Sequence, residues 1–481
     1  MNTAAKGLAF WPLRASETPS SAGLGVGLGA ELLTAGAIAL GFVAFLVLVE
    51  LWHRRSGPPV ETTRKLVHVV SGLPVLVLPW LFQSVWTVVG LLAFVAALFA
   101  LTRRRGLLES VHDVERRSRG DLLYPLGIVL LFTLGHERPV LYFVSVLVLI
   151  LSDPAAALIG LAYGRTRYEV EEHWRSMEGS LAFFLMTFLA VHLPLLLMTE
   201  LEPAVTVLVG LVVGIAVTLF EAISLDGADN LAVPLATYLF LERLTPESPA
   251  TLGVHAGVLL TLMVVLALLA RRFDFLKESG VMAATLFFYL VFALAGPAWL
   301  VPPAVATLAL ILFRATLRHA ISRHDAEYQV VAIAYATLPT LALVVGLRLP
   351  ELGAAWGGGR PEAFAAVLSG AVAGQLGIMF ATQFHPFNPS QPRGLPLVRL
   401  MALLLGAWAL IVPASLGAAG ALDLGGAALA AAVALISGLT YWLGRSATTW
   451  PSAAPWNFRL QAATVTGVSL LAVGFFPALG G

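Results

Sequence analysis

Long apolar runs, separated by short polar segments, repeat along the chain. A helix needs about 20 mostly apolar residues to cross the hydrocarbon core of a bilayer, and the pattern predicts sixteen such segments, give or take two. They must be helices, because an open sheet edge in lipid leaves backbone groups unpaired. The predicted fold class is therefore all-α, a polytopic integral membrane helical bundle of about 14–18 transmembrane helices. The predicted spans are 33–52, 66–82, 85–102, 121–135, 139–163, 180–198, 203–225, 230–242, 251–270, 281–296, 299–313, 330–348, 363–383, 396–416, 420–443 and 461–478.

The composition agrees with this pattern. Of 481 residues, 58% are hydrophobic and only 12% are charged, whereas about 25% are charged in an ordinary soluble domain. Too few polar groups remain to cover a soluble surface, which excludes a cytosolic enzyme, a nucleic-acid-binding protein and a disordered chain. The absence of cysteine excludes disulfides, thiolate nucleophiles and cysteine-ligated zinc. Residues 1–30 lack the apolar core of a signal peptide and are predicted to form a loose N-terminal tail.

The basic residues gather on one predicted face. With the N-terminus outside, the loops after odd-numbered spans contain 22 of the 29 Lys and Arg residues. The positive-inside rule makes this face cytoplasmic in a protein of the cell membrane. Acidic residues become sparse after residue 280, so we divide the chain near 275 into a motif-rich half, 31–275, and a motif-poor half, 276–481.

A basic cluster opens the second span. Arg64 and His68 are four residues apart and Lys65 and His68 three apart, so the three side chains share one side of a helix. Two interpretations stay open. The cations can anchor the helix at the membrane interface with their charged ends in water. Alternatively His68, one turn deeper, marks a polar site inside the span.

A carboxylate and a proline interrupt the fifth span. Asp153 follows a long apolar run and precedes Pro154. Pro154 cannot continue a helix ladder but suits the first position of a new helix, so the sequence predicts a broken helix with Ser152 or Asp153 as its N-cap. The new N-terminus would present free amides to a phosphate or metal–phosphate group. A capped kink without any ligand is the alternative.

A cation, a carboxylate, a glycine and a hydroxyl lie together before the sixth span, at Arg175, Glu178, Gly179 and Ser180. Arg175 offers a planar fork of donors for phosphate, and Gly179 permits close approach of the backbone to a ligand. The alternative is an ordinary helix start, with Ser176 or Ser180 as the cap and Glu178 near the positive end of the helix dipole.

An acidic group lies at the end of the seventh span. Glu221, Asp226, Asp229 and Asn230 occur within ten residues, in a loop without any basic residue. Oxygen ligands of this kind suit Mg²⁺ that also carries phosphate and water. Asp226-Gly227 alone is explained by a tight turn, but a turn does not explain Glu221 and Asp229.

The four groups lie at or near one predicted face and supply cations, carboxylates and a helix N-terminus. These are the components of phosphoryl transfer, in which catalysis is mainly positioning and charge neutralisation. The sequence contains no Walker A loop and no kinase-type glycine-rich loop in a suitable context.

Over residues 60–240 these motifs resemble the polyprenol kinase family, which includes dolichol, phytol and farnesol kinases and CTP-dependent diacylglycerol kinases. The resemblance implies an integral membrane enzyme that phosphorylates a lipid alcohol, usually with CTP and a divalent cation. The family usually has Gly where this chain has Ser152, and Lys where it has Arg175. The motifs that carry the resemblance are Arg64-Lys65-x-x-His68, Asp153-Pro154-Ala155-Ala156 with Gly160 and Gly164, Glu178-Gly179-Ser180, and Glu221-Ala-Ile-Ser224 with Asp229-Asn230-Leu-x-Val-Pro234.

We therefore predict a polyprenol-kinase-like catalytic domain over 31–275, a CTP-dependent kinase of a long-chain isoprenoid alcohol of the phytol, geranylgeraniol or dolichol type. The lipid alcohol, the nucleotide and the bilayer are its partners. The hypothesis assigns catalytic roles to Asp153, Glu221 and His68, with Glu221 as support or base and His68 as a possible second base. It assigns nucleotide or phosphate binding to Arg64, Lys65, Arg175, Glu178, Gly179 and Ser180, and Mg²⁺ binding to Asp153, Asp229 and Asn230.

The motif-poor half shows a fainter likeness. Ser279-Gly280 with Ala283-Ala284, and Asp325 with Tyr328-Gln329-Val330, are a little similar to the phytyl-phosphate kinase family. The span 363–383 contains no carboxylate, so this half is predicted to hold lipid or act as a scaffold. Two other functions stay open for the whole chain, a CDP-lipid synthase that attacks the α-phosphorus of CTP and a transporter built on broken helices.

Overall fold

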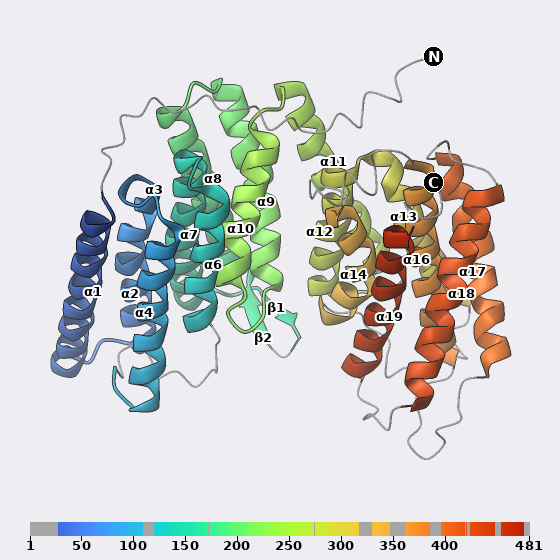
Figure 1. Cartoon of the computed structure of the whole chain (residues 1–481), viewed down its shortest axis with the longest axis horizontal. Helices are drawn as coiled ribbons and strands as arrows, with labels where there is room; N and C mark the ends of the chain where they lie inside the picture. Colours follow the sequence, from blue (N-terminus) through green and yellow to red (C-terminus); the bar gives the residue numbers. More distant parts are fainter. Residues whose placement is uncertain are drawn as a thin grey trace. The chain divides into compact units, whose positions relative to one another are not determined.

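The computed structural model of the chain is almost entirely helical (Figure 1). Twelve described helices are long and apolar enough to cross a membrane, and three shorter apolar helices accompany them. The predicted all-α class is confirmed, and each predicted span overlaps a described helix, although Val77 divides the span 66–82 and the span 299–313 begins in a 3-10 helix. The structure describes residues 27–108, 120–171, 173–273, 275–316, 330–346, 361–384, 396–418, 420, 424–447 and 454–475. Most of the predicted tail, and the stretch Asp325–Gln329, lie outside these residues.

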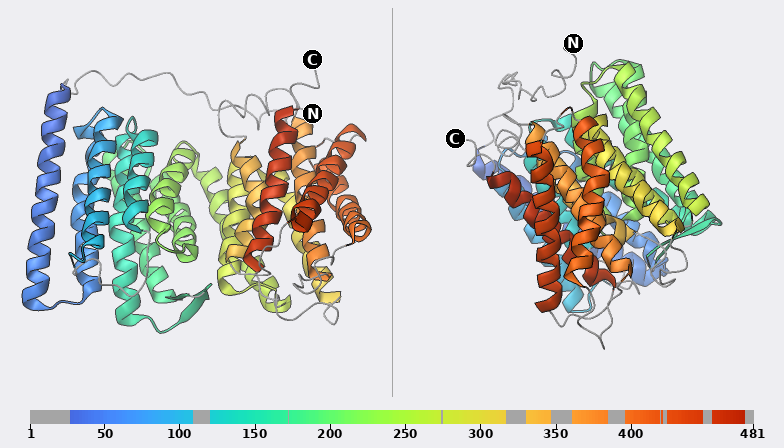
Figure 2. Two further views of the ribbon diagram at one scale, coloured as in Figure 1. Left: turned by 60° about the horizontal axis from the view of Figure 1, so that its bottom comes forward. Right: turned by 90° about the vertical axis from the view of Figure 1, so that its right-hand side faces the viewer.

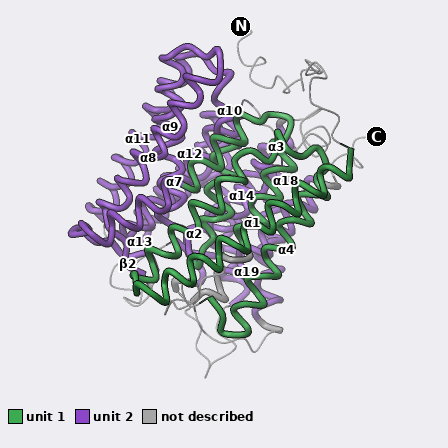
Figure 3. The backbone as a smooth tube through the Cα atoms, turned by 90° about the vertical axis from the view of Figure 1, so that its left-hand side faces the viewer, with its two compact units in different colours: residues 1–150, 226–238 green, residues 151–225, 239–481 purple. Residues whose placement is uncertain are grey.

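The chain forms two compact units (Figure 3). Unit 1 comprises residues 1–150 and 226–238, and unit 2 comprises residues 151–225 and 239–481. These units are defined by packing. The predicted division near 275 separates two functions and stays a prediction.

Unit 1 contains the basic cluster. Its helices α1 and α4 pack together, and buried Glu31 of α1 accepts hydrogen bonds from the backbone N–H of Gln83, at 2.9 Å, and the hydroxyl of Thr87, at 3.0 Å. A close backbone approach also brings α6 against the start of α10. A Cβ on Gly127 of α6 would lie 2.7 Å from the carbonyl oxygen of Asn230. The elements of unit 1 are α1 (Leu28–Ser56), α2 (Val60–Leu76), α3 (Leu78–Leu81), α4 (Val85–Arg104), α6 (Gly120–Gly135), and the first parts of α7 (Pro139–Tyr163) and α10 (Asp229–Leu244).

The first part of unit 2 carries a short antiparallel hairpin that the sequence did not predict. Its register pairs Tyr168 with Arg175, and it lies at the ends of α8 and α9 (Figure 2). Helices α8 and α9 pack closely because Gly210 and Gly214 lie against the rings of Phe188 and Phe184. These elements are the remainder of α7, β1 (Arg167–Val170), β2 (His173–Ser176), α8 (Met177–Met198), α9 (Pro203–Ile223), the remainder of α10, and α11 (Pro249–Phe273).

The second part of unit 2 is built around one central helix, α16. Within the span Glu362–Thr382, 94% of an 18-residue apolar window is buried inside the protein. Small residues make this possible, since a Cβ on Gly370 would lie 2.6 Å from the carbonyl oxygen of Ala430 in α18. The elements are α12 (Glu278–Ala295), η2 (Pro297–Leu300), α13 (Val301–Thr316), α14 (Val330–Gly346), α16 (Pro361–Phe384), α17 (Leu397–Ala418), α18 (Leu424–Ala447) and α19 (Ala454–Phe475).

The predicted break at Pro154 is wrong. Helix α7 runs without interruption from Pro139 to Tyr163, with Pro154 inside it. Membrane helices tolerate an internal proline because neighbouring groups compensate for the lost backbone donor. Ser152 therefore caps no helix; its buried hydroxyl accepts a hydrogen bond from Thr187 of α8 at 3.0 Å. The free helix N-terminus that was predicted to bind phosphate here is absent from α7.

Candidate active site

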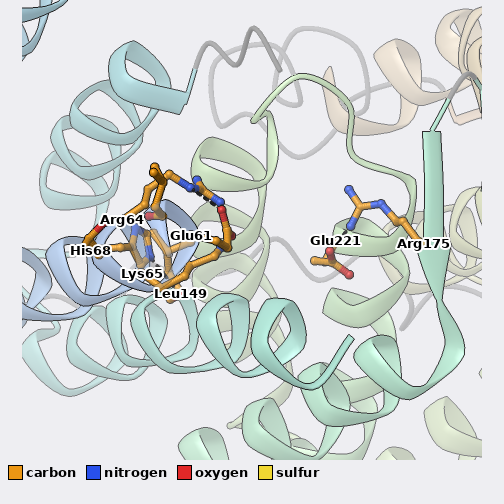
Figure 4. Close-up of polar contacts among 9 residues, drawn as sticks. Glu61, Arg64, Lys65, His68, Leu149, Arg175 and Glu221 are labelled. Atoms are coloured by element: carbon orange, nitrogen blue, oxygen red, sulfur yellow. Dashed lines mark hydrogen bonds and ion pairs between the residues drawn. The ribbon is translucent and has the colours of Figure 1, made fainter. Parts of the chain in front are cut away.

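The basic cluster of unit 1 includes a carboxylate that sequence reasoning missed (Figure 4). On α2, Arg64 donates two hydrogen bonds to Glu61, at 3.0 and 2.6 Å, and the Nζ atom of Lys65 lies 3.9 Å from the same carboxylate. Glu61 precedes these cations by three and four residues. Side chains at this spacing are neighbours on a helix, so the spacing alone could have identified the pair.

Burial separates Lys65 from Arg64. Lys65 is only 5% exposed, while the side chain of Arg64 is 39% exposed. An interfacial anchor keeps its ammonium group in water, so the anchor interpretation does not fit Lys65. Burying an ammonium group is costly unless it is paired, and the carboxylate of Glu61 is a partner for this lysine.

His68 lies one turn deeper on α2. Its Nε2 atom is 3.4 Å from the carbonyl oxygen of Leu149, and its ring packs edge-on against Tyr124 with the ring centroids 5.4 Å apart. If Nε2 carries the proton toward the carbonyl, Nδ1 is the acceptor. The carbonyl of Leu149 and the ring of Tyr124 thus hold the imidazole of His68 in one orientation.

The acidic loop ends at α10, within unit 1. Asp226 and Gly227 have positive φ values of 52° and 83°, so the turn expected from Asp-Gly is present. Helix α10 begins at Asp229, and both Asp229 and Asn230 are partly buried. A carboxylate in the first turn of a helix is stabilised by the helix dipole, so the position of Asp229 at the start of α10 suits a charged side chain.

In unit 2 the structure brings together two residues that the sequence treated separately. Arg175 of β2 donates to the carboxylate of Glu221, in the last turn of α9, and also to the carbonyl oxygen of Ser224 at 2.7 Å (Figure 4). The side chain of Glu221 is 8% exposed and that of Arg175 is 21% exposed. This mostly buried ion pair fixes the hairpin to the end of α9.

The start of α8 follows the ordinary helix-start interpretation. The hydroxyl of Ser176 accepts from the backbone N–H of Gly179 at 3.1 Å. The carboxylate of Glu178 accepts from the backbone N–H of Thr166, at 3.0 and 3.3 Å. A Cβ on Gly179 would lie 2.9 Å from the carbonyl oxygen of Ala156 in α7. The close approach expected at Gly179 is therefore made by the α7 backbone.

Ser180 and Asp153 complete the predicted set in unit 2. The hydroxyl of Ser180 is hydrogen-bonded to that of Tyr168 at 2.8 Å, and burial raises the pKa of the Tyr168 hydroxyl above its ordinary value, so this tyrosine stays neutral at physiological pH. Asp153 lies in the middle of α7 and is partly buried.

Among the described residues, no group of three or more His, Asp or Glu could hold a metal ion by itself. Enzymes that transfer phosphate bind Mg²⁺ through one or two carboxylates together with the phosphate oxygens and water. In unit 1, Asp229 and Asn230 offer a carboxylate and an amide oxygen of this kind, and in unit 2 Asp153 offers a carboxylate.

Comparisons with known proteins identify relatives of the chain. The chain is 38% identical over 222 residues to the phytol kinase of Synechocystis sp., a match that covers 45% of this chain and 89% of the relative. The chain belongs to the phytol kinase family. A second relative, the probable phytol kinase 1, chloroplastic, of Glycine max, is 28% identical over 237 residues, covering 44% of this chain and 78% of the relative. No family model and no solved structure matches the chain.

This membership confirms the predicted enzyme class, a kinase acting on a lipid alcohol, in an integral membrane protein. More than half of the chain has no counterpart in the matched stretch of either relative.

Proposed function

We propose that this membrane enzyme transfers the γ-phosphoryl group of CTP to the hydroxyl of a long-chain isoprenoid alcohol of the phytol type, at the cytoplasmic face of the membrane. The proposal rests on the match to the phytol kinase of Synechocystis sp., which is 38% identical to this chain over 89% of its own length. The hydroxyl oxygen of the alcohol attacks the γ-phosphorus, the bond from that phosphorus to the bridging oxygen breaks, and CDP leaves. The hydroxyl proton passes to a base of the protein.

The cations of α2 supply charge neutralisation in this proposal. Lys65 is buried, and an ammonium group removed from water attracts phosphate oxygens more strongly than an exposed one. Arg64 is oriented by its two hydrogen bonds to Glu61. Both residues are proposed to hold the nucleotide phosphates.

His68 is the better of the two proposed bases. Glu221 already accepts a hydrogen bond from Arg175, and a proton on that carboxylate would weaken the ion pair that fixes the hairpin. Imidazole is the most frequent general base in proteins, and the carbonyl of Leu149 holds the ring of His68 in place. We therefore propose His68 as the base and Glu221 as the residue that holds Arg175 toward phosphate.

Asp153, Asp229 and Asn230 are proposed as the protein ligands of a magnesium ion that the nucleotide carries. The ion, when bound, neutralises charge on the phosphate oxygens. The first turn of α8 contains Glu178, Gly179 and Ser180. We propose that this end of the helix faces the nucleotide.

A labelling experiment tests the proposal. The purified protein, reconstituted in lipid, is incubated with γ-labelled CTP or ATP and phytol, geranylgeraniol, dolichol or diacylglycerol. We expect labelled phytyl or geranylgeranyl monophosphate, with CTP preferred to ATP and Mg²⁺ required. Transfer of label from α-labelled CTP into lipid, with release of pyrophosphate, would indicate a CDP-lipid synthase, and label in no lipid would refute kinase activity.

A further inference from the structure

The β1–β2 hairpin connects Arg175 with the motif-poor second half of the chain, residues 276–481. Strand β2 carries Arg175 and leads directly into α8, while β1 is paired with it in antiparallel register, with Tyr168 opposite Arg175. Because this register is fixed by backbone hydrogen bonds, a displacement of β1 moves Arg175 with it. Whatever holds β1 therefore also places the guanidinium group.

The apolar side of β1 packs on helices of the second half. Tyr168 and Val170 are 4% and 0% exposed, and they form one buried cluster with Ala283 of α12 and Val330 of α14. The left view of Figure 2 shows the hairpin reaching these helices, and β1 contacts α12 directly. Apolar surface on residues 276–346 thus covers one face of the hairpin.

The polar side chains of the hairpin reach the same two helices. Glu169 of β1 forms an ion pair with Lys277, the residue that precedes α12, at 3.1 Å. Both side chains are partly exposed, so this pair contributes little to stability by itself. It does fix which part of α12 the strand faces.

Glu171, at the turn of the hairpin, makes the second polar contact. Its carboxylate accepts a hydrogen bond of 2.8 Å from the backbone N–H of Val331, in the first turn of the described part of α14. The backbone of Glu171 has a positive φ of 53°, a conformation that a non-glycine residue adopts only when its surroundings hold it there. A carboxylate that binds a first-turn N–H group is a favourable partner for the helix dipole.

We propose that α12 and α14 of the second half anchor the β1–β2 hairpin and thereby position Arg175 for binding of the nucleotide phosphates. Glu169, Glu171 and Lys277 are positioning residues, which act on the nucleotide through Arg175. This inference rests on the proposed function for the role of Arg175. It also gives the second half a part in the reaction, although that half contributes none of the predicted site residues.

Kinetics on the full chain test the positioning. Glu171→Ala removes the acceptor for Val331, whereas Glu171→Gln keeps an oxygen that can accept the same hydrogen bond. We expect Glu171→Ala to raise the nucleotide KM about tenfold, with the lipid KM and the thermal midpoint in detergent unchanged, and Glu171→Gln to behave as the wild type. Glu169→Lys and Lys277→Glu should each raise the nucleotide KM, and the double variant should restore it.

Glu247→Lys is the matched control. It breaks another partly exposed ion pair, with Arg243, which lies outside the hairpin, and the nucleotide KM should stay at the wild-type value. If Glu171→Ala and Glu169→Lys left the nucleotide KM unchanged in an active enzyme, the positioning role would be refuted. A change in the nucleotide KM that came together with a change in the lipid KM and a lower thermal midpoint would also refute it.

A second readout does not depend on activity. The chain has no cysteine, so Trp174→Cys, at an exposed position of β2, accepts a single nitroxide spin label. We expect Glu171→Ala and Lys277→Glu to make the label more mobile in its electron paramagnetic resonance spectrum, and Glu247→Lys to leave it unchanged. An unchanged label in all variants would refute the anchor itself, whereas an inactive wild type with a responsive label would refute the proposed function alone.

Discussion

The cations of α2 and the arginine of β2 are held by carboxylates in two different ways. On α2, Arg64 and Glu61 are three residues apart on one helix, and both side chains are substantially exposed, 39% and 28%. On β2, Arg175 and Glu221 are 46 residues apart and largely buried. The first pair forms wherever α2 is helical, while the second requires the hairpin and the end of α9 to be assembled. The same chemistry therefore has a local origin in unit 1 and a tertiary origin in unit 2.

The largest expected effect concerns the buried cation of the local cluster. Lys65→Met removes the ammonium group but keeps a side chain of similar size, and we expect kcat/KM to fall by about 10²–10³, the usual cost of removing one preorganised group that stabilises the transition state. Phosphorylation of phytol by reconstituted protein measures it. Arg64→Met, the exposed neighbour, is the control and should cost less than tenfold, about 1.4 kcal/mol at most. Equal losses would show that burial does not distinguish the two cations.

The second effect concerns the tertiary pair. Glu221→Ala leaves the guanidinium group of Arg175 without its buried carboxylate, and breaking a buried pair in this way costs about 3 kcal/mol. Unfolding in mixed detergent and sodium dodecyl sulfate micelles measures this loss. The double variant with Arg175→Met should recover part of it, because no charge is then left buried alone. A double variant as unstable as Glu221→Ala would contradict the ion pair as the source of stability.

These two regions also show what the sequence can and cannot predict. Every predicted span overlaps a described helix, because apolar length and the need to satisfy backbone groups in lipid are local properties. Glu61 could have been found by its spacing from Arg64. The pairing of Arg175 with Glu221, and of Glu171 with Val331, could not, since residues so far apart meet only through packing. The break expected at Pro154 failed for a related reason, because neighbouring helices decide whether a proline ends a membrane helix.

A third prediction separates packing from ligand binding at the start of α8. In Gly179→Ala the new methyl group would lie 2.9 Å from the carbonyl oxygen of Ala156, so α7 and α8 must move apart. We expect a loss of about 1–3 kcal/mol in stability, as for other overpacked positions, measured by the same unfolding assay. Gly36→Ala, on α1 with open space around it, is the matched control and should be neutral or slightly stabilising. A raised nucleotide KM without any loss of stability would instead indicate a direct ligand contact at Gly179.

The smallest effect tests the local pair, and it completes the comparison with Glu221. Arg64→Met removes the exposed cation of the pair and leaves Glu61 in place beside buried Lys65. Exposed ion pairs within a helix contribute about 0.3–0.5 kcal/mol. We therefore expect a change in unfolding free energy of that size, several times smaller than for Glu221→Ala, and one that disappears in high salt because exposed charges are screened. The large cost predicted for Glu221→Ala should persist in salt, since its pair is mostly buried. Equal costs for Arg64→Met and Glu221→Ala, or equal salt dependence, would remove the distinction between a pair that one helix forms alone and a pair that the assembled fold must build.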